Sequence, residues 1–302
     1  MPDAELHFVT KLSYKIVTDN NPYIDKFFYL DNDLPAVIEK LKKENYDHVI
    51  DLHNNLRSLR IKKALKKKSY SINKLNIEKF LLTNLNINIM PTAHITQRSL
   101  ETAAALGISD DGLGLDYFIP QKDIVKQSDI PTSHSAGFIS IVIGATYETK
   151  KMPVHKLQEL CYKIDHPIIL LGGKEDFEDA VKIASVDPVK IYNACGKFNL
   201  NESADLVRQS KLVVTHDTGL MHIAAALQKP IISIWGNTSP LFGMYPYYGT
   251  SSTQQYDVAE VKLRCRPCSK IGYHQCPLEH FKCMENQDID EIVRLVIEWI
   301  RK

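Results

Sequence analysis

The sequence contains no long hydrophobic run and has almost no net charge. No stretch of its 302 residues approaches the roughly 18 consecutive apolar residues of a membrane-spanning helix. The first residues, MPDAELHFVT, show no basic segment followed by an apolar one, which is the pattern of a secretory signal. A net charge of +1, from 37 Lys and Arg against 36 Asp and Glu, argues against a general nucleic-acid-binding surface. We therefore expect a cytoplasmic protein without a nucleic-acid partner.

Cysteine is also scarce. Six cysteines in a chain of this length are too few for the dense disulfide framework of small secreted domains. Four of them lie close together with the spacing C-x2-C-x7-C-x6-C: Cys265, Cys268, Cys276 and Cys283. The first pair has the spacing of a tetrahedral zinc site, whereas the second pair does not. A structural zinc and a set of reduced thiols in a packed loop therefore both remain open.

Short β-branched apolar runs alternate with amphipathic segments along the second half of the chain. The runs occupy residues 137–143, 167–171, 189–193, 211–215 and 230–235. This alternation is typical of a parallel sheet covered by helices on both faces, that is, of a Rossmann-like α/β domain.

The first half repeats this alternation less clearly. Strands are predicted at residues 5–9, 25–30, 47–52 and 69–72, with helical segments between them. Residues 117–137 contain Pro, Ser and Gly with little periodicity, and they are the predicted linker. We expect an N-terminal domain over residues 1–131, a C-terminal domain over 132–288 and a terminal helix over 289–302.

The stretch HDTGLMH follows a predicted strand and opens a predicted helix. Ligands of parallel sheets bind at the carboxyl ends of the strands, where helix N-termini present free N–H groups to anions. Thr218, Gly219 and Leu220 can offer backbone amides to a phosphate, while Asp217 and His222 can support the loop. The alternative is a structural turn in which Asp217 is only a helix N-cap.

A second polar loop, GATYETKKMP, follows the first strand of the C-terminal domain. Gly144 allows close backbone approach, Thr146 and Thr149 offer hydroxyls, and Lys150 or Lys151 offers a cation. The loop has neither the GxxxxGK[ST] nor the GxGxxG spacing. A solvated pair of lysines is the alternative, but two such loops at the edge of one sheet favour a diphosphate site.

Two further loops contain charged residues that point to ligands. In LGGKEDFEDA, Glu175 and Asp176 are candidates to bind a ribose, or are first-turn helix residues favoured by the dipole. In DLHNNLRSLRIKKALKKK, Arg57 and Arg60 lie in the first turn of a predicted helix, where cations are unfavourable, so they suggest an anionic ligand. Residues 62–68 are predicted to form a solvated basic face, with contact to anionic lipid headgroups as an alternative.

Together these segments resemble the heptosyltransferase family, glycosyltransferases of the GT-B type that transfer heptose from ADP-heptose to the inner core of lipopolysaccharide. HDTGLMHIAAALQKPIISIWGNTSP resembles the family signature D-T-G-x-x-H-x-x-A-A…P…G-x-T-S-P, with Asn237 where many members have Pro. GATYETKKMP is similar to the family's G-A-S…K-x-W-P loop, with Met152 in the Trp position. DLHNNLRS and CRPCSKIGYHQCPLEHFKCM are similar to two further family segments.

The resemblance implies two facing Rossmann-like domains with the site between them, and a terminal helix that crosses back to the first domain. It implies metal-independent transfer without a cofactor, in which Lys150 and the helix amides stabilise the leaving ADP. The implied donor-binding residues are Gly144, Thr146, Lys150, Asp176, Asp217, Thr218, Gly219, Leu220 and His222. Asn55, Arg57 and Arg60 are implied to bind the anionic sugars of a lipid-linked acceptor. Such an acceptor is compatible with peripheral contact at the inner face of the cytoplasmic membrane.

One family feature has no match in this sequence. The family opens with a strand and an S-S-x-G-D loop whose Asp is the implied base, whereas MPDAELHFVT resembles the family's second strand. We therefore expect the base before Met1, an N-terminal domain without its first strand and helix, and little transfer by residues 1–302. Two alternatives remain open: a GT-B enzyme that uses another nucleotide sugar, and a nucleotide-binding pseudoenzyme. The oligomeric state is open as well.

Overall fold

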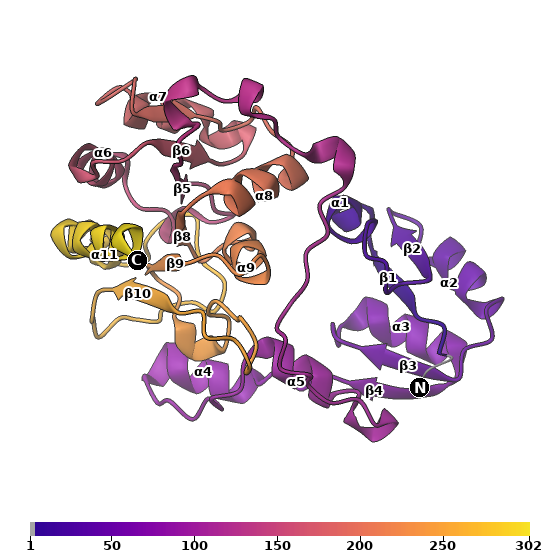
Figure 1. The fold of residues 1–302 in the computed structure, drawn as a ribbon. Helices are drawn as coiled ribbons and strands as arrows, with labels where there is room; N and C mark the ends of the chain where they lie inside the picture. Colours follow the sequence, from indigo (N-terminus) through magenta and orange to yellow (C-terminus); the bar gives the residue numbers. More distant parts are fainter. Residues whose placement is uncertain (1–3) are drawn as a thin grey trace. The chain divides into compact units, whose positions relative to one another are not determined.

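The chain forms two compact units. The computed structural model describes residues 4–302. Unit 1 contains residues 4–76 and 91–111, and unit 2 contains residues 77–90 and 112–302 (Figure 1). The predicted α/β class is confirmed, because every strand pair in the described residues is parallel and helices alternate with the strands.

The segment predicted as a linker, residues 117–137, belongs to unit 2. The backbone N–H of Val125 donates to the buried carboxylate of Asp205 at 2.9 Å, and the Val125 side chain is buried in the core of unit 2. These contacts join residues that lie far apart in the sequence, so no local pattern predicts them. The change of unit falls at residue 112, whereas residue 132 was the expected start of the second domain.

Unit 2 is built on a six-stranded parallel sheet with the strand order β10-β9-β8-β5-β6-β7. The strands are β5 (Ile139–Val142), β6 (Ile168–Leu171), β7 (Ile191–Asn193), β8 (Leu212–His216), β9 (Ile231–Trp235) and β10 (Tyr256–Glu260). The apolar runs predicted β5 to β9. They did not predict β10, an edge strand whose side chains are partly exposed and which includes Asp257 and Glu260.

Helices cover both faces of this sheet (Figure 1). Residues of β8 alternate between the two faces: Leu212 and Val214 pack in one apolar cluster, and Val213 packs in the other. On the first face lie α6 (Val154–Lys163), α7 (Phe177–Ala184), the short α10 (Lys282–Glu285) and α11 (Ile289–Arg301). On the second face lie α8 (Leu200–Gln209) and α9 (Gly219–Ala226).

The terminal helix α11 packs on unit 2. Ile289, Ile292 and Val296 occupy one helical face and are buried beside α6, β8 and β9. The indole N–H of Trp299 also donates to Asp257 of β10 at 2.6 Å. We expected this helix to cross back to the first domain, but its apolar face is used within unit 2.

Unit 1 contains two separate pairs of parallel strands. β1 (His7–Lys11) pairs with β2 (Lys26–Leu30), and β3 (His48–Asp51) pairs with β4 (Lys68–Ser71). Its helices are α1 (Lys15–Thr18), α2 (Leu34–Lys42), α3 (Leu56–Leu65) and α5 (Ile95–Glu101). A small core packs β2 and α2 against α3. The four strands lie at the predicted runs. The expectation that this domain lacks its first strand and helix stays a prediction.

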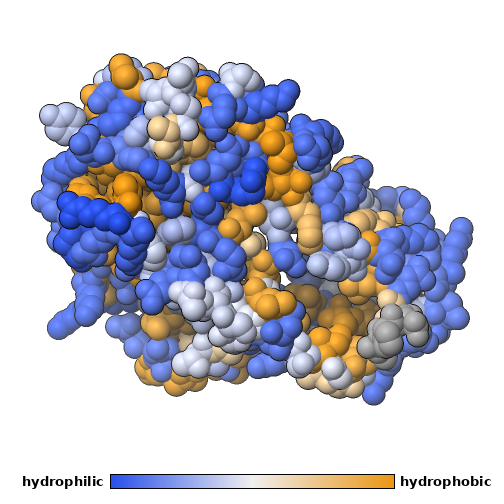
Figure 2. Space-filling model, viewed as in Figure 1, coloured by the Kyte–Doolittle hydropathy of each residue, from blue (hydrophilic) through white to orange (hydrophobic). Residues whose placement is uncertain are grey.

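Helix α4 (Asn76–Leu85) exposes apolar side chains to solvent. Ile77, Phe80 and Leu85 are each more than half exposed, and only Leu82 is buried. Figure 2 shows hydrophobic residues at the lower edge of unit 2, where α4 lies. Helix α4 therefore adds an apolar surface to this unit. Within residues 4–302, no helix is long and apolar enough to cross a bilayer.

Candidate functional site

The HDTGLMH segment forms an open turn between β8 and α9. Thr218 is the N-cap residue, and the helix begins at Gly219, as predicted. A methyl group added at Gly219 would meet no atom within 4 Å. The Thr218 hydroxyl is buried and has no hydrogen-bond partner within the described residues. The turn thus offers first-turn amides at the open Gly219 position and, next to them, a buried hydroxyl without a partner, an arrangement suited to a phosphate group.

Lys150 reaches this turn from the loop that follows β5. Its Nζ lies 2.7 Å from Oδ2 of Asp217, and the two side chains are only 15% and 11% exposed. The Thr238 hydroxyl donates to the same carboxylate oxygen at 2.9 Å. No side chain caps α9, so the alternative in which Asp217 is only an N-cap is wrong. Asp217 instead holds a cation next to the amides of the turn.

Lys151, the next residue, points to a different carboxylate. Its Nζ lies 3.1 Å from Oδ1 of Asp176, whose Oδ2 accepts the backbone N–H of Gly173 at 2.9 Å. Partial burial alone would lower the pKa of Lys151, but hydrogen bonds to Glu148 and Asp176 outweigh it and raise the pKa. A Cβ at Gly144 would collide with the Asp176 carboxylate. Gly144 is therefore required by packing, and Asp176 is 5% exposed and already paired.

The two threonines of the same loop differ in their surroundings. Thr146 is exposed. Thr149 is buried, and its hydroxyl donates to the carbonyl of Tyr273 at 3.0 Å and accepts its N–H at 2.8 Å. The sequence offered Thr149 as a hydroxyl for phosphate, but its hydrogen bonds are used to join this loop to the cysteine-containing loop.

One histidine, His216, is the last residue of β8, and a second, His222, lies in α9. His216, which we did not single out from the sequence, is fully buried and accepts the N–H of Met152 at 3.1 Å. Burial, reinforced by the nearby charge of Lys151, lowers the pKa of His216 to about 4. Burial also lowers the pKa of His222, against the opposing charge of Asp217. Both imidazoles are neutral near pH 7, and Leu220 packs its side chain on the core, leaving its amide for the turn.

The buried His216 makes stability depend on pH. In the unfolded chain its pKa returns to about 6.5, so the unfolded state binds a proton first as the pH falls. The contribution of His216 to stability is fully present above about pH 6.5. It falls by about 3 kcal/mol as the pH decreases to about 4. Urea titrations at pH 7.5 and 4.5 should show this loss. His155→Asn, at an exposed histidine, should leave the loss unchanged, and His216→Gln should reduce it; an equal loss in both variants would contradict the assignment.

The four clustered cysteines surround one small cavity in unit 2. They share this space of about 30 Å³ with His280, Thr149 and Asn237: Cys265, Cys268, Cys276 and Cys283. All are free thiols, and burial raises the pKa of Cys283 to about 12. Within residues 4–302, no three His, Cys, Asp or Glu side chains are placed to hold a metal ion. The structure therefore does not show the structural zinc that we considered from the spacing.

The expected acceptor-binding residues lie on α3 of unit 1. Asn55 caps the helix, because its side-chain carbonyl accepts the N–H groups of Arg57 at 2.9 Å and Ser58 at 3.0 Å. Arg57 and Arg60 are exposed, and neither forms an ion pair within the described residues. Lys62 does not belong to a solvated basic face, since its Nζ lies 2.7 Å from Oδ2 of the buried Asp51. Asn55 thus has a structural role, while the two arginines are available for an anion.

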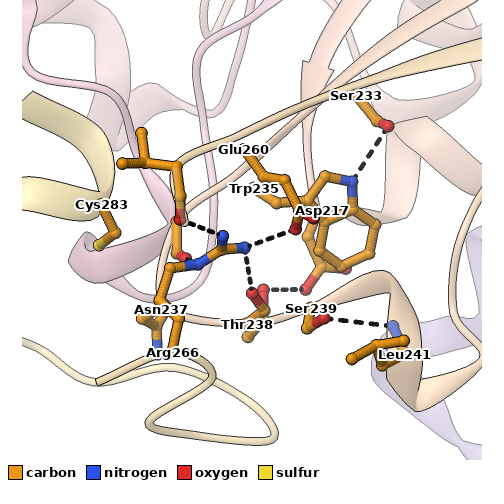
Figure 3. A network of polar contacts seen from close by, with 12 residues as sticks. Asp217, Ser233, Trp235, Asn237, Thr238, Ser239, Leu241, Glu260, Arg266 and Cys283 are labelled. Carbon is orange, nitrogen blue, oxygen red and sulfur yellow. Dashed lines mark hydrogen bonds and ion pairs between the residues drawn. The ribbon is translucent and has the colours of Figure 1, made fainter. Parts of the chain in front are cut away.

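A buried arginine connects the loops that follow β9 and β10 (Figure 3). Arg266, 7% exposed at the side chain, donates to the backbone carbonyls of Gly236, Val261 and Thr238 and pairs with Glu260 at 3.0 Å. Thr238 is the residue whose hydroxyl holds Asp217. Thr238 stands in the signature stretch quoted above, and Arg266 stands in the quoted segment CRPCSKIGYHQCPLEHFKCM, but neither residue was singled out from the sequence. Its contacts fix the residue that positions the carboxylate beside Lys150.

The sequence pattern of glycosyltransferase family 9 (heptosyltransferase) matches residues 35–278. The chain belongs to this family. Most of unit 2, including both polar loops, lies within the match. The glycosyltransferase class and the heptosyltransferase resemblance predicted from the motifs are confirmed.

Two curated relatives and one solved structure show the extent of the similarity. Lipooligosaccharide heptosyltransferase 2 of Haemophilus influenzae is 32% identical over 143 residues, which are 46% of this chain and 41% of that protein. Lipopolysaccharide heptosyltransferase 1 of Campylobacter coli is 24% identical over 263 residues, 78% of this chain and 76% of that protein. The chain thus spans less than half of the first relative and about three-quarters of the second. The structure of E. coli ADP-heptose lipopolysaccharide heptosyltransferase II superposes with a TM-score of 0.70 at 16% identity, covering 99% of this chain and 90% of that one. This likeness shows the fold alone.

Proposed function

We propose that this protein transfers a heptose from ADP-heptose to the inner core of lipopolysaccharide, with the donor bound on unit 2. The observation that carries the proposal is the unpartnered Thr218 hydroxyl beside the open first turn of α9, with the Lys150 ammonium held next to it by Asp217. The family supports a heptosyl donor, and the E. coli protein of the same fold is named for ADP-heptose.

In this proposal the turn of unit 2 stabilises the leaving group. As the bond between the anomeric carbon and the donor phosphate breaks, negative charge accumulates on ADP, beside Lys150 and the amides of Gly219 and Leu220. Because a fixed cation and the helix dipole offset this charge, the transfer needs no metal ion. Thr146, exposed in the neighbouring loop, is proposed as a further hydroxyl contact to the phosphates.

The acceptor is proposed to be a lipid-linked sugar with anionic groups. Arg57 and Arg60, exposed and without ion pairs in the described part of unit 1, would bind those groups. A base must remove the proton from the acceptor hydroxyl. The resemblance assigns this role to an S-S-x-G-D loop, which residues 1–302 do not contain, so weak transfer by this polypeptide stays a prediction. A lipid-linked acceptor also supports peripheral association of a cytoplasmic enzyme with the membrane.

Nucleotide selectivity tests the donor assignment. ADP at about 100 times its Kd should raise Tm by about 5 °C, and UDP and GDP should raise it less, with or without EDTA. Thermal shift measurements with the three nucleotides decide this. The matched variant Thr218→Val should lower the ADP response, because it replaces the unpartnered hydroxyl by a methyl group. A larger response to UDP would contradict the heptosyltransferase proposal and favour another nucleotide sugar.

A further inference from the structure

A second cavity of unit 2 lies beside the ends of β9 and β10, outside the turn proposed for the donor. Its volume is about 430 Å³, which is within the range of small-molecule sites. The last residue of β10 and the residues that follow β9 and β10 supply most of its wall, among them Ser239, Leu241, Glu260, Lys262, Arg264 and Arg266. None of these residues was predicted to bind a ligand.

The wall of this cavity carries an excess of positive charge. Lys262 and Arg264 are exposed, and neither forms an ion pair within residues 4–302. The carboxylate of Glu260 is already paired with Arg266 at 3.0 Å, so its charge is offset. Leu241 adds an apolar surface, 47% exposed, against which a sugar ring can pack. Two unpaired cations next to an apolar surface are suited to an anionic carbohydrate.

The cavity is connected to the donor turn by hydrogen bonds (Figure 3). Arg266, which lines the cavity, donates to the Thr238 carbonyl at 3.0 Å, and the Thr238 hydroxyl holds Asp217 at 2.9 Å. Ser239, also in the wall, is the residue after Thr238. The next contact of this series is Asp217 with Lys150 at 2.7 Å. A ligand in the cavity would therefore lie beside the residues that position the donor diphosphate.

We infer that this cavity binds an anionic sugar of the acceptor. The inference rests on the proposed function, since it assigns one anionic sugar of that reaction's acceptor to unit 2, distinct from the groups assigned to Arg57 and Arg60. Lys262 and Arg264 bind the carboxylate or phosphate of the sugar, and Leu241 contacts its ring. Arg266 keeps the wall in place, because its own hydrogen bonds are directed to backbone carbonyls and to Glu260.

Binding of delipidated lipopolysaccharide inner-core oligosaccharide tests the inference. In isothermal titration, Lys262→Ala/Arg264→Ala should weaken binding about tenfold or more, while ADP affinity stays within about twofold of the unchanged protein. The charge-matched control Lys122→Ala/Lys126→Ala removes two exposed lysines of unit 2 outside the cavity and should bind normally. Lys262→Arg/Arg264→Lys retains both charges and should keep most of the affinity. Maltotriose, a neutral oligosaccharide, should not bind.

The outcomes separate this inference from the proposed function. Unchanged oligosaccharide binding by Lys262→Ala/Arg264→Ala overturns the inference and leaves the donor assignment intact. Weakened ADP binding by the same variant also overturns it, because the cavity would then serve the donor. If the unchanged protein binds the oligosaccharide through these cations but does not bind ADP, the proposed function fails while the anion site remains. Both side chains are exposed, so thermal melting should show that the variant is folded.

Discussion

Replacing Lys150 by alanine is expected to weaken ADP binding about 100-fold. The change removes a charge-assisted contact to the diphosphate and leaves Asp217, 11% exposed at its side chain, without its cation. An unpaired carboxylate beside the phosphates then adds repulsion to the lost attraction. Isothermal titration with ADP measures the effect, and thermal melting of the unliganded variant shows whether the fold persists.

Two other lysines of unit 2 provide the controls for Lys150. Lys182 is exposed on α7 and pairs locally with Asp179, so Lys182→Ala should leave ADP affinity unchanged. Lys151→Ala should mainly lower thermal stability and have little effect on ADP affinity, because Lys151 pairs with Asp176 instead of facing the turn. ADP affinity of Lys150→Ala within about twofold of the unchanged protein would show that this lysine does not contact the diphosphate.

Asp176→Ala is expected to lower the free energy of unfolding by about 3 kcal/mol. The carboxylate is 5% exposed, pairs with Lys151 and accepts the N–H of Gly173. Its removal leaves a largely buried ammonium with Glu148 as its remaining partner and a backbone N–H without an acceptor. Urea unfolding followed by circular dichroism measures the change. Asp179→Ala, at an exposed acid of the following helix, should change stability by less than about 0.5 kcal/mol.

Asp176→Asn distinguishes the structural role of this residue from the ribose contact that the resemblance implies. Asparagine keeps the shape of the side chain and can still accept the Gly173 N–H. If the carboxylate binds ribose, this variant should lose ADP affinity even under conditions in which it is fully folded. If Asp176 only supports Lys151 and Gly173, the variant should lose stability and bind ADP normally when folded. An Asp176→Ala protein as stable as the unchanged one would rule out the structural role.

Local sequence patterns were sufficient for most strands of unit 2. β5, β6, β8 and β9 consist mainly of β-branched and other apolar residues buried on both faces, which is the pattern of central parallel strands. β10 was not predicted because it is an edge strand with partly exposed side chains. It includes Asp257 and Glu260, so it lacks a continuous apolar run. The segment 117–137 looked like a linker, but contacts such as that of Val125 with Asp205 make it part of unit 2.

The candidate site was predicted less completely than the strands. The start of α9 at Gly219 and the capping position of Thr218 follow from residues that are adjacent in sequence. Lys150 and Lys151 could not be told apart, because both follow the same strand and their carboxylate partners lie far along the chain. In the sequence His216 is one more residue after an apolar run, and only its hydrogen bond to the Met152 N–H in the folded protein shows its structural role.

The sequence by itself determined which segments of unit 2 become strands and helices, and which polar loop joins β8 to the start of α9. These properties depend on apolar periodicity and on residues a few positions apart. Only the tertiary structure decided which side chains meet: Lys150 with Asp217, 67 positions later, and Arg266 with Thr238, 28 positions earlier. The order β10-β9-β8-β5 brings the loops after these four strands to one edge of the sheet. Spacing along the chain does not specify strand order, so the charged contacts and the cavity beside them became visible only in the folded protein.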